Sequence, residues 1–234
     1  TNTAANHGVA AAITFEKITY TKPGTYTYTV VEESSNAGGV TNDPDAQRTV
    51  QVVVTDNGDG TLTAVLDAAN SEQIAFTNTY SVGAEDLYLT GTKTLTGDWS
   101  AVPGSNKVFT FHILEGATIK SVGSADLRVS DTITFQKLTF TEAGVYNYTI
   151  VEVDNGSGGI TYSDKVYALT VTVSDNGDGT LTAAYTVDGV ARGDITFANS
   201  YTTSPYRLSL VAHKNYKYRN NNDKPLVNIG GSLQ

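Results

Sequence analysis

The chain has 234 residues, including 14 tyrosines and a single tryptophan, and its formal net charge at pH 7 is −9. This length suits one large or two ordinary globular domains, and the acidic balance argues against nucleic acid as a partner. Because the chain has no cysteine, neither disulfides nor thiolate metal sites are available to it. It also shows no methionine, signal peptide or transmembrane run. We therefore interpret it as a processed chain or an excised segment that does not insert into a membrane.

Two long stretches of the sequence repeat each other. ITFEKITYTKPGTYTYTVVEESSNAGGV, at 13–40, aligns without a gap to ITFQKLTFTEAGVYNYTIVEVDNGSGGI, at 133–160. Each copy continues through a DNGDGTLTA segment and closes in a similar strand, IAFTNTY at 74–80 and ITFANSY at 195–201. A third, partial copy opens near the C-terminus, where YRLSLVAHK resembles DLYLTGTK. Such self-similarity is typical of a tandem array.

The repeat divides the chain into three parts. The first module, residues 1–81, lacks its opening strands. The second module, residues 82–202, is complete, and the C-terminal tail, residues 203–234, is either the first strand of a further module or a donor strand.

The second module reads as strands throughout. Short runs rich in Val, Ile, Thr, Tyr and Phe are separated by clusters of Gly, Asn and Asp, and no ten-residue window has a helical period. Seven strands are predicted, the number of an immunoglobulin-like sandwich. They lie near 87–95, 107–114, 132–140, 145–153, 166–174, 180–186 and 194–201. We therefore predict an all-β protein of tandem immunoglobulin-like β-sandwich modules.

The acidic DNGDG segments at 56–60 and 175–179 each join two predicted strands. Asn-Gly and Asp-Gly supply the positive φ angles of tight hairpins, so a turn is the favoured interpretation. A calcium loop is the alternative, but the acidic residues do not follow the EF-hand spacing. The histidines, His7, His112 and His213, are isolated, so we expect neither a metal site nor a cofactor.

Side-chain alternation directs three polar groups toward the core of the second module. Lys93 shares a strand face with leucines, Glu152 shares one with tyrosines and Ile, and Asn199 shares one with Ile and Phe. The first module repeats two of these positions, as Glu32 and Asn78. Since an unpaired buried charge is costly, the three groups of the second module are expected to meet.

A cluster of a lysine, a glutamate and an asparagine in the core can react. Burial lowers the pKa of an amine and raises that of a carboxylic acid, which gives a neutral nucleophile beside a protonated acid that can polarise an amide carbonyl. Attack of Lys93 Nζ on Asn199 Cγ, with Glu152 moving protons, would expel ammonia and leave an intramolecular isopeptide bond. The reaction occurs once per molecule, so the protein is not an enzyme with turnover. The alternative is an unreacted hydrogen-bonded network, or a lysine that extends to the surface.

The motifs LTGTKTLTG, GVYNYTIVEV, DNGDGTLTA and ITFANSY together resemble the streptococcal pilin isopeptide-linkage domain of Gram-positive pilus shafts and surface-protein stalks. The resemblance implies that Lys93 and Asn199 form the crosslink and that Glu152 is catalytic. It implies an incomplete site in the first module, where Glu32 and Asn78 have no lysine. It also implies an extracellular, wall-attached protein whose partners are adjacent modules of the same protein.

The tail offers a lysine for the incomplete site. Leu208, Leu210, Ala212 and Lys214 share the strand parity of the Lys93 segment. The tail of one copy could therefore complete the first module of another by strand addition, with Lys214 bonded to Asn78, in a head-to-tail homopolymer. The alternative is a truncated module.

Two classes of function remain open from the sequence. In the first, the modules form a structural pilus or stalk, which the near-identical repetition favours. In the second, the module is an adhesin that binds a host surface ligand through loops such as 97–107 or 34–46, and the crosslink serves stability only. We expect Trp99, in the first of these loops, to pack against the core.

Overall fold

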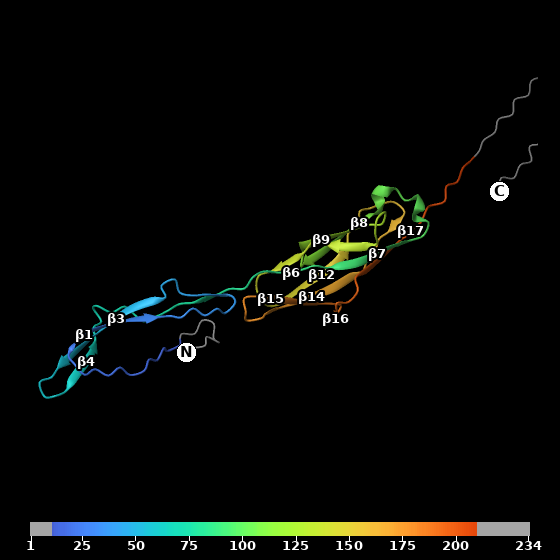
Figure 1. Cartoon of the computed structure of the whole chain (residues 1–234). Coiled ribbons are helices and arrows are strands. Elements are labelled where there is room, and N and C mark those ends of the chain that lie inside the picture. Colours follow the sequence, from blue (N-terminus) through green and yellow to red (C-terminus); the bar gives the residue numbers. More distant parts are fainter. Residues whose placement is uncertain (1–10, 210–234) are drawn as a thin grey trace, which may run out of the picture. The chain divides into compact units, whose positions relative to one another are not determined.

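The computed structural model describes residues 11–209 of the chain. The chain divides into two units, residues 1–202 and residues 203–234, and the described part of the second unit, 203–209, contains no strand. Within the described residues, strands and two short 3-10 helices are the regular elements, so the protein is all-β as predicted (Figure 1). No helix of the described part is long and apolar enough to cross a membrane.

The first module contains a three-stranded antiparallel sheet in the order β1-β3-β4 and a separate β2-β5 pair. The strands are β1 (Gly24–Val31), β2 (Val40–Thr41), β3 (Gln47–Asp56), β4 (Leu62–Leu66) and β5 (Thr79–Tyr80). Alternating Thr and Tyr residues form β1, because β-branched and aromatic side chains suit a pleated surface with one covered face.

Several apolar side chains of the first module are exposed although their repeat partners form the core of the second. Ile13 and Phe15 are 48% and 56% exposed, whereas Ile133 and Phe135 are 0% and 4% exposed. Among residues 11–81, which the structure describes, no strand covers this apolar surface as strands do in the second module.

The second module is built on a ten-stranded sheet in the order β13-β17-β7-β10-β9-β8-β12-β14-β15-β16, with β11 and β6 as a separate pair. Its strands are β6 (Glu85–Leu87), β7 (Thr90–Thr96), β8 (Val108–Glu115), β9 (Thr118–Asp126), β10 (Thr132–Phe135), β11 (Leu138–Phe140), β12 (Gly144–Glu152), β13 (Ile160–Thr161), β14 (Val166–Asp175), β15 (Leu181–Val187), β16 (Val190–Ala191) and β17 (Thr196–Tyr201). The 3-10 helices are η1 (Trp99–Ala101) and η2 (Gly104–Lys107).

The long sheet folds over so that strands far apart in its order face each other across one core. Phe197 of β17 packs against Phe111 of β8 and Tyr167 of β14, with ring centroids 5.1 and 5.3 Å apart. The result is a β-sandwich, in agreement with the predicted fold class.

The second module has more strands than the seven predicted. The first predicted run is divided, because β6 pairs with β11 while β7 pairs with β10 and β17. The sequence interpretation also missed β9, whose inward positions are Ser121, Gly123 and Ala125. These residues are small because the space is taken by an aromatic ring: a Cβ on Gly123 would lie 2.5 Å from the Phe135 ring.

Both DNGDG segments are hairpin turns, as predicted, and join β3 to β4 and β14 to β15. Gly58 and Gly60 have φ angles of 77° and 87°, and their counterparts Gly177 and Gly179 have 78° and 84°. These values lie in the left-handed region that favours glycine, which explains the two glycines in each segment.

Candidate functional site

Three strands of the second module bring the predicted polar residues together. β17 runs parallel to β7, with Phe197 opposite Lys93, so the two strands with Lys93 and Asn199 are direct neighbours. Glu152 ends β12, in the facing layer. Lys93 and Asn199 are 0% and 2% exposed, as the alternation predicted.

Glu152 contacts both nitrogens of the site through a single oxygen. Its Oε1 lies 2.8 Å from Lys93 Nζ, and the side chains of this ion pair are fully buried. The same Oε1 accepts a hydrogen bond of 2.8 Å from Asn199 Nδ2. One carboxylate oxygen therefore lies within proton-transfer distance of the amine and of the amide nitrogen.

The Asn199 amide is oriented by the main chain. The backbone N–H of Ser163 donates to Asn199 Oδ1 over 2.9 Å and also approaches Glu152 Oε2 at 3.3 Å. Since a backbone N–H can only donate, Oδ1 must face Ser163 and Nδ2 must face Glu152.

This orientation differs from the sequence expectation, in which the acid polarises the amide carbonyl. In the structure a main-chain donor polarises the carbonyl, and Glu152 faces the nitrogen that would leave. Ser163 has no signal in the sequence, because its contribution comes from the backbone and not from its side chain.

The surroundings of Lys93 favour its neutral form. Burial lowers the pKa of Lys93, and the nearby Glu152 carboxylate opposes this shift without cancelling it. The amine lies over the Phe109 ring, with Nζ 4.6 Å from the ring centroid, so this contact also opposes the shift. A lowered amine pKa increases the fraction of the nucleophilic form at neutral pH.

The first module reproduces the hydrogen bonds of the site without the amine, although Asn78 is exposed where Asn199 is buried. Asn78 Nδ2 donates to Glu32 Oε1 over 2.9 Å, and the N–H of Asp43, the repeat partner of Ser163, donates to Asn78 Oδ1 over 2.8 Å. Glu32 Oε2 is buried and accepts no hydrogen bond from the described residues. The acceptor half of the site is thus formed, and the proposed donor, Lys214, lies outside the described residues.

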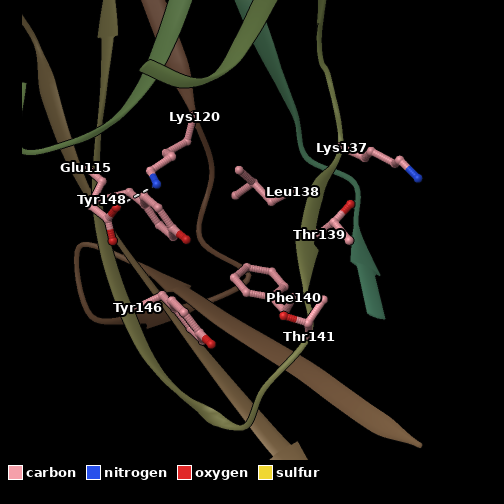
Figure 2. Close-up of a pocket in the computed structure, with 9 residues that line it drawn as sticks. All are labelled: Glu115, Lys120, Lys137, Leu138, Thr139, Phe140, Thr141, Tyr146 and Tyr148. Atoms are coloured by element: carbon pink, nitrogen blue, oxygen red, sulfur yellow. Dashed lines mark ion pairs between the residues drawn. The ribbon is translucent and has the colours of Figure 1, made fainter. Parts of the chain in front are cut away.

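A pocket of about 400 Å³ lies elsewhere in the second module, beside β11 and β12. In Figure 2 the rings of Phe140, Tyr146 and Tyr148 line it, while the Lys137 side chain points away from them. Lys137 Nζ forms an ion pair with Asp86 Oδ2 over 2.6 Å. The pocket involves neither of the loops predicted for an adhesin.

Those loops have structural contacts of their own. Trp99 of loop 97–107 packs against the core, as expected, and the Lys107 amine lies 5.0 Å from the centre of its indole. Loop 34–46 supplies the Asp43 N–H that orients Asn78.

The comparisons with known proteins identify the family of the chain. A family model described as FctA, Spy0128-like isopeptide containing domain, matches residues 1–81 and 89–202. Among solved structures, a variant of the major pilin from Streptococcus pyogenes has 19% sequence identity and a TM-score of 0.25, with 78% of this chain and 71% of that chain covered. No curated protein matches the chain. Because the family model covers most of the sequence, the chain belongs to the Spy0128-like isopeptide containing domain family.

Proposed function

We propose that the chain is a structural part of a Gram-positive pilus or surface stalk, outside the cell, whose second module is locked by a self-formed bond between Lys93 and Asn199. Membership of an isopeptide containing family supports this proposal. The observation that carries it is the position of Glu152 Oε1, which lies 2.8 Å from each of the two nitrogens that must exchange protons.

The geometry suggests a balanced sequence of steps. The lone pair of neutral Lys93 Nζ attacks Asn199 Cγ, and the negative charge that develops on Oδ1 is held by the Ser163 N–H. Glu152 accepts a proton from Nζ and delivers a proton to Nδ2. The Cγ–Nδ2 bond breaks and ammonia leaves, while the new Nζ–Cγ bond joins β7 to β17.

Intact mass of the folded chain tests the bond. We expect the mass to be one ammonia below the sequence value, and fragment spectra to join the peptides that contain Lys93 and Asn199. Glu152→Ala should restore the full mass while the module still folds. A wild-type chain with the full sequence mass would reduce the three residues to a buried polar network.

We also propose that the first module takes its lysine from the tail of another copy. The exposed Ile13 and Phe15 and the unpaired Glu32 Oε2 favour an added strand with an amine at this site. Lys214 would then bond to Asn78, with loss of one ammonia per junction.

Denaturing electrophoresis tests this second bond. We expect covalent multimers from the wild-type chain and none from Lys214→Arg, while the internal bond of the second module forms in both. If the wild-type chain migrates only as a monomer, the intermolecular bond does not form, and the proposal for the second module is unaffected.

A further inference from the structure

The hairpin 175–179 of the second module is held by the end of the first module. The Tyr80 hydroxyl donates to Asp175 Oδ1 over 2.7 Å and accepts a hydrogen bond from the Gly179 N–H over 3.1 Å. The Gly83 N–H donates to the Gly179 carbonyl over 2.8 Å. One tyrosine and the main chain therefore contact both ends of the DNGDG turn.

Two glycines of the first module allow the main chains to touch. A Cβ on Gly38 would lie 2.0 Å from the Asp178 carbonyl oxygen, and a Cβ on Gly179 would lie 2.5 Å from the Gly39 nitrogen. Neither position has room for a side chain. We call Tyr80, Gly38 and Gly39 the socket.

The second module repeats the socket at its own end. Tyr201 is the repeat partner of Tyr80, and Gly158 and Gly159 are the partners of Gly38 and Gly39. A Cβ on Gly39 would lie 2.7 Å from Cε2 of Tyr80, and a Cβ on Gly159 would lie 2.7 Å from Cε2 of Tyr201.

The backbone of this second socket also matches that of the first. The Thr202 N–H donates to the Gly159 carbonyl over 2.8 Å, as the Ser81 N–H does to the Gly39 carbonyl over 2.9 Å. A Cβ on Gly158, however, would meet nothing within 4 Å. Among the described residues, no hairpin lies against the second socket.

The first module repeats the hairpin. Asp56 Oδ1 accepts from the Gly58 N–H over 2.9 Å, as Asp175 Oδ1 does from the Gly177 N–H over 2.8 Å. A Cβ on Gly58 or Gly60 would meet nothing within 4 Å. The hairpin 56–60 thus has the same turn as the hairpin 175–179. Among the described residues, no socket lies against it.

We propose that the socket and the DNGDG hairpin are a non-covalent coupling between successive modules, and that the socket at Tyr201 takes the DNGDG hairpin of a further copy of the module. The socket and the hairpin are chemically complementary. The neutral phenol of Tyr80 donates to Asp175 of the hairpin, and Gly38 and Gly39 leave room for the hairpin backbone. The hydrogen bond to Asp175 raises the pKa of Tyr80, so the donor stays protonated. The coupling is independent of the isopeptide bond.

Amide hydrogen exchange on the full chain tests the coupling that is already present. We expect the Gly179 amide to be protected and the Gly60 amide, its counterpart on the hairpin without a socket, to exchange faster. Tyr80→Phe should speed exchange of the Gly179 amide by about fivefold and so remove much of this difference, since one hydrogen bond contributes roughly 1 kcal/mol. Tyr201→Phe is the matched control and should leave Gly179 unchanged. Equal exchange at Gly179 and Gly60 in the wild-type chain would overturn the coupling.

A titration of isotope-labelled chain with unlabelled chain tests the proposed occupant. We expect the Gly58 and Gly60 amide signals to shift as the unlabelled concentration rises. Unlabelled Gly158→Val should cause no shift, because its side chain would block the hairpin while lying in open space in its own module. Shifts that persist with Gly158→Val, or the absence of shifts with the wild-type chain, would exclude the second copy as the occupant.

Discussion

At the scale of single residues, the fold sets the orientation of the Asn199 amide. The Ser163 N–H contacts its oxygen and Glu152 contacts its nitrogen, so the amide cannot rotate without losing both hydrogen bonds. The first module holds Asn78 in the same way, with the Asp43 N–H in place of Ser163. Main-chain geometry is therefore part of the site in both modules.

Ser163→Pro tests the role of this N–H, because proline removes the donor. We expect bond formation to slow by about 10²- to 10³-fold, the usual effect of deleting one oxyanion donor. The fraction of crosslinked chain, followed by intact mass during cell-free synthesis, measures the rate. Ser163→Ala retains the N–H and should react like the wild type. A folded Ser163→Pro chain that reacts at the wild-type rate would remove Ser163 from the mechanism.

The stability of the unreacted module should depend on pH through Lys93. We expect no bond to form in Glu152→Gln. Burial lowers the pKa of Lys93 from 10.5, and in this variant the Glu152 carboxylate that opposes the shift is absent. Between the two pKa values the unfolded state binds more protons, so the free energy of unfolding rises with pH, by up to about 1.4 kcal/mol per pH unit. Urea denaturation at increasing alkaline pH measures this slope.

The double variant Glu152→Gln, Lys93→Met is the control for this slope. It retains every other titrating group of the single variant but has no buried amine. If both variants show the same pH dependence, Lys93 is not the group responsible.

At the scale of elements, β9 shows how a strand can escape detection in the sequence. Its buried face consists of Ser121, Gly123 and Ala125, so it lacks the apolar alternation that marks the other strands. The missing volume is supplied by Phe135 from β10, which only the folded structure reveals.

Gly123→Val should destabilise the second module, because its Cβ would lie 2.5 Å from the Phe135 ring. Overpacking of this kind costs about 1–3 kcal/mol, which a shift of the urea midpoint would detect. Val122 is 36% exposed on the opposite face of the same strand, so Val122→Ala should change stability by about 0.5 kcal/mol or less. Equal midpoints for the two variants would contradict the packing explanation.

The sequence predicts the buried side chains of the site but not its main-chain hydrogen-bond donor. Alternation places Lys93 and Asn199 in the core, and the structure agrees, because both lie on regular strands with large apolar neighbours. The Ser163 N–H could not be predicted, since every non-proline residue has the same donor and only the loop path directs it. The roles of the three side chains in a reaction stay predictions until the mass is measured.

At the scale of the molecule, the proposed bond removes most of the second module from the path of a pulling force. Residues 93 and 199 would be joined directly, so the 105 residues between them could not extend. At about 3.3–3.6 Å per residue, the extension that the bond would prevent is on the order of 350 Å.

Single-molecule force spectroscopy on the full chain can measure the extension that the bond would prevent. We expect no extension of the second module in the wild type and an added step of about 350 Å in Glu152→Ala, given the usual reach of an extended chain. The first module, which has no internal lysine at its site, serves as the reference within each trace. An identical step in both proteins would show that the bond carries no load.

The parallel pairing of β7 with β17 has a consequence even before any bond forms. The chain enters this pair at Thr90 and leaves it at Tyr201, which lie at opposite ends because the strands run in the same direction. Tension across the module therefore shears the pair and loads all of its hydrogen bonds at once, whereas an antiparallel pair pulled from one end would open one bond at a time. A newly folded module under tension would thus keep Lys93 beside Asn199 for longer, which lengthens the time available for the proposed reaction.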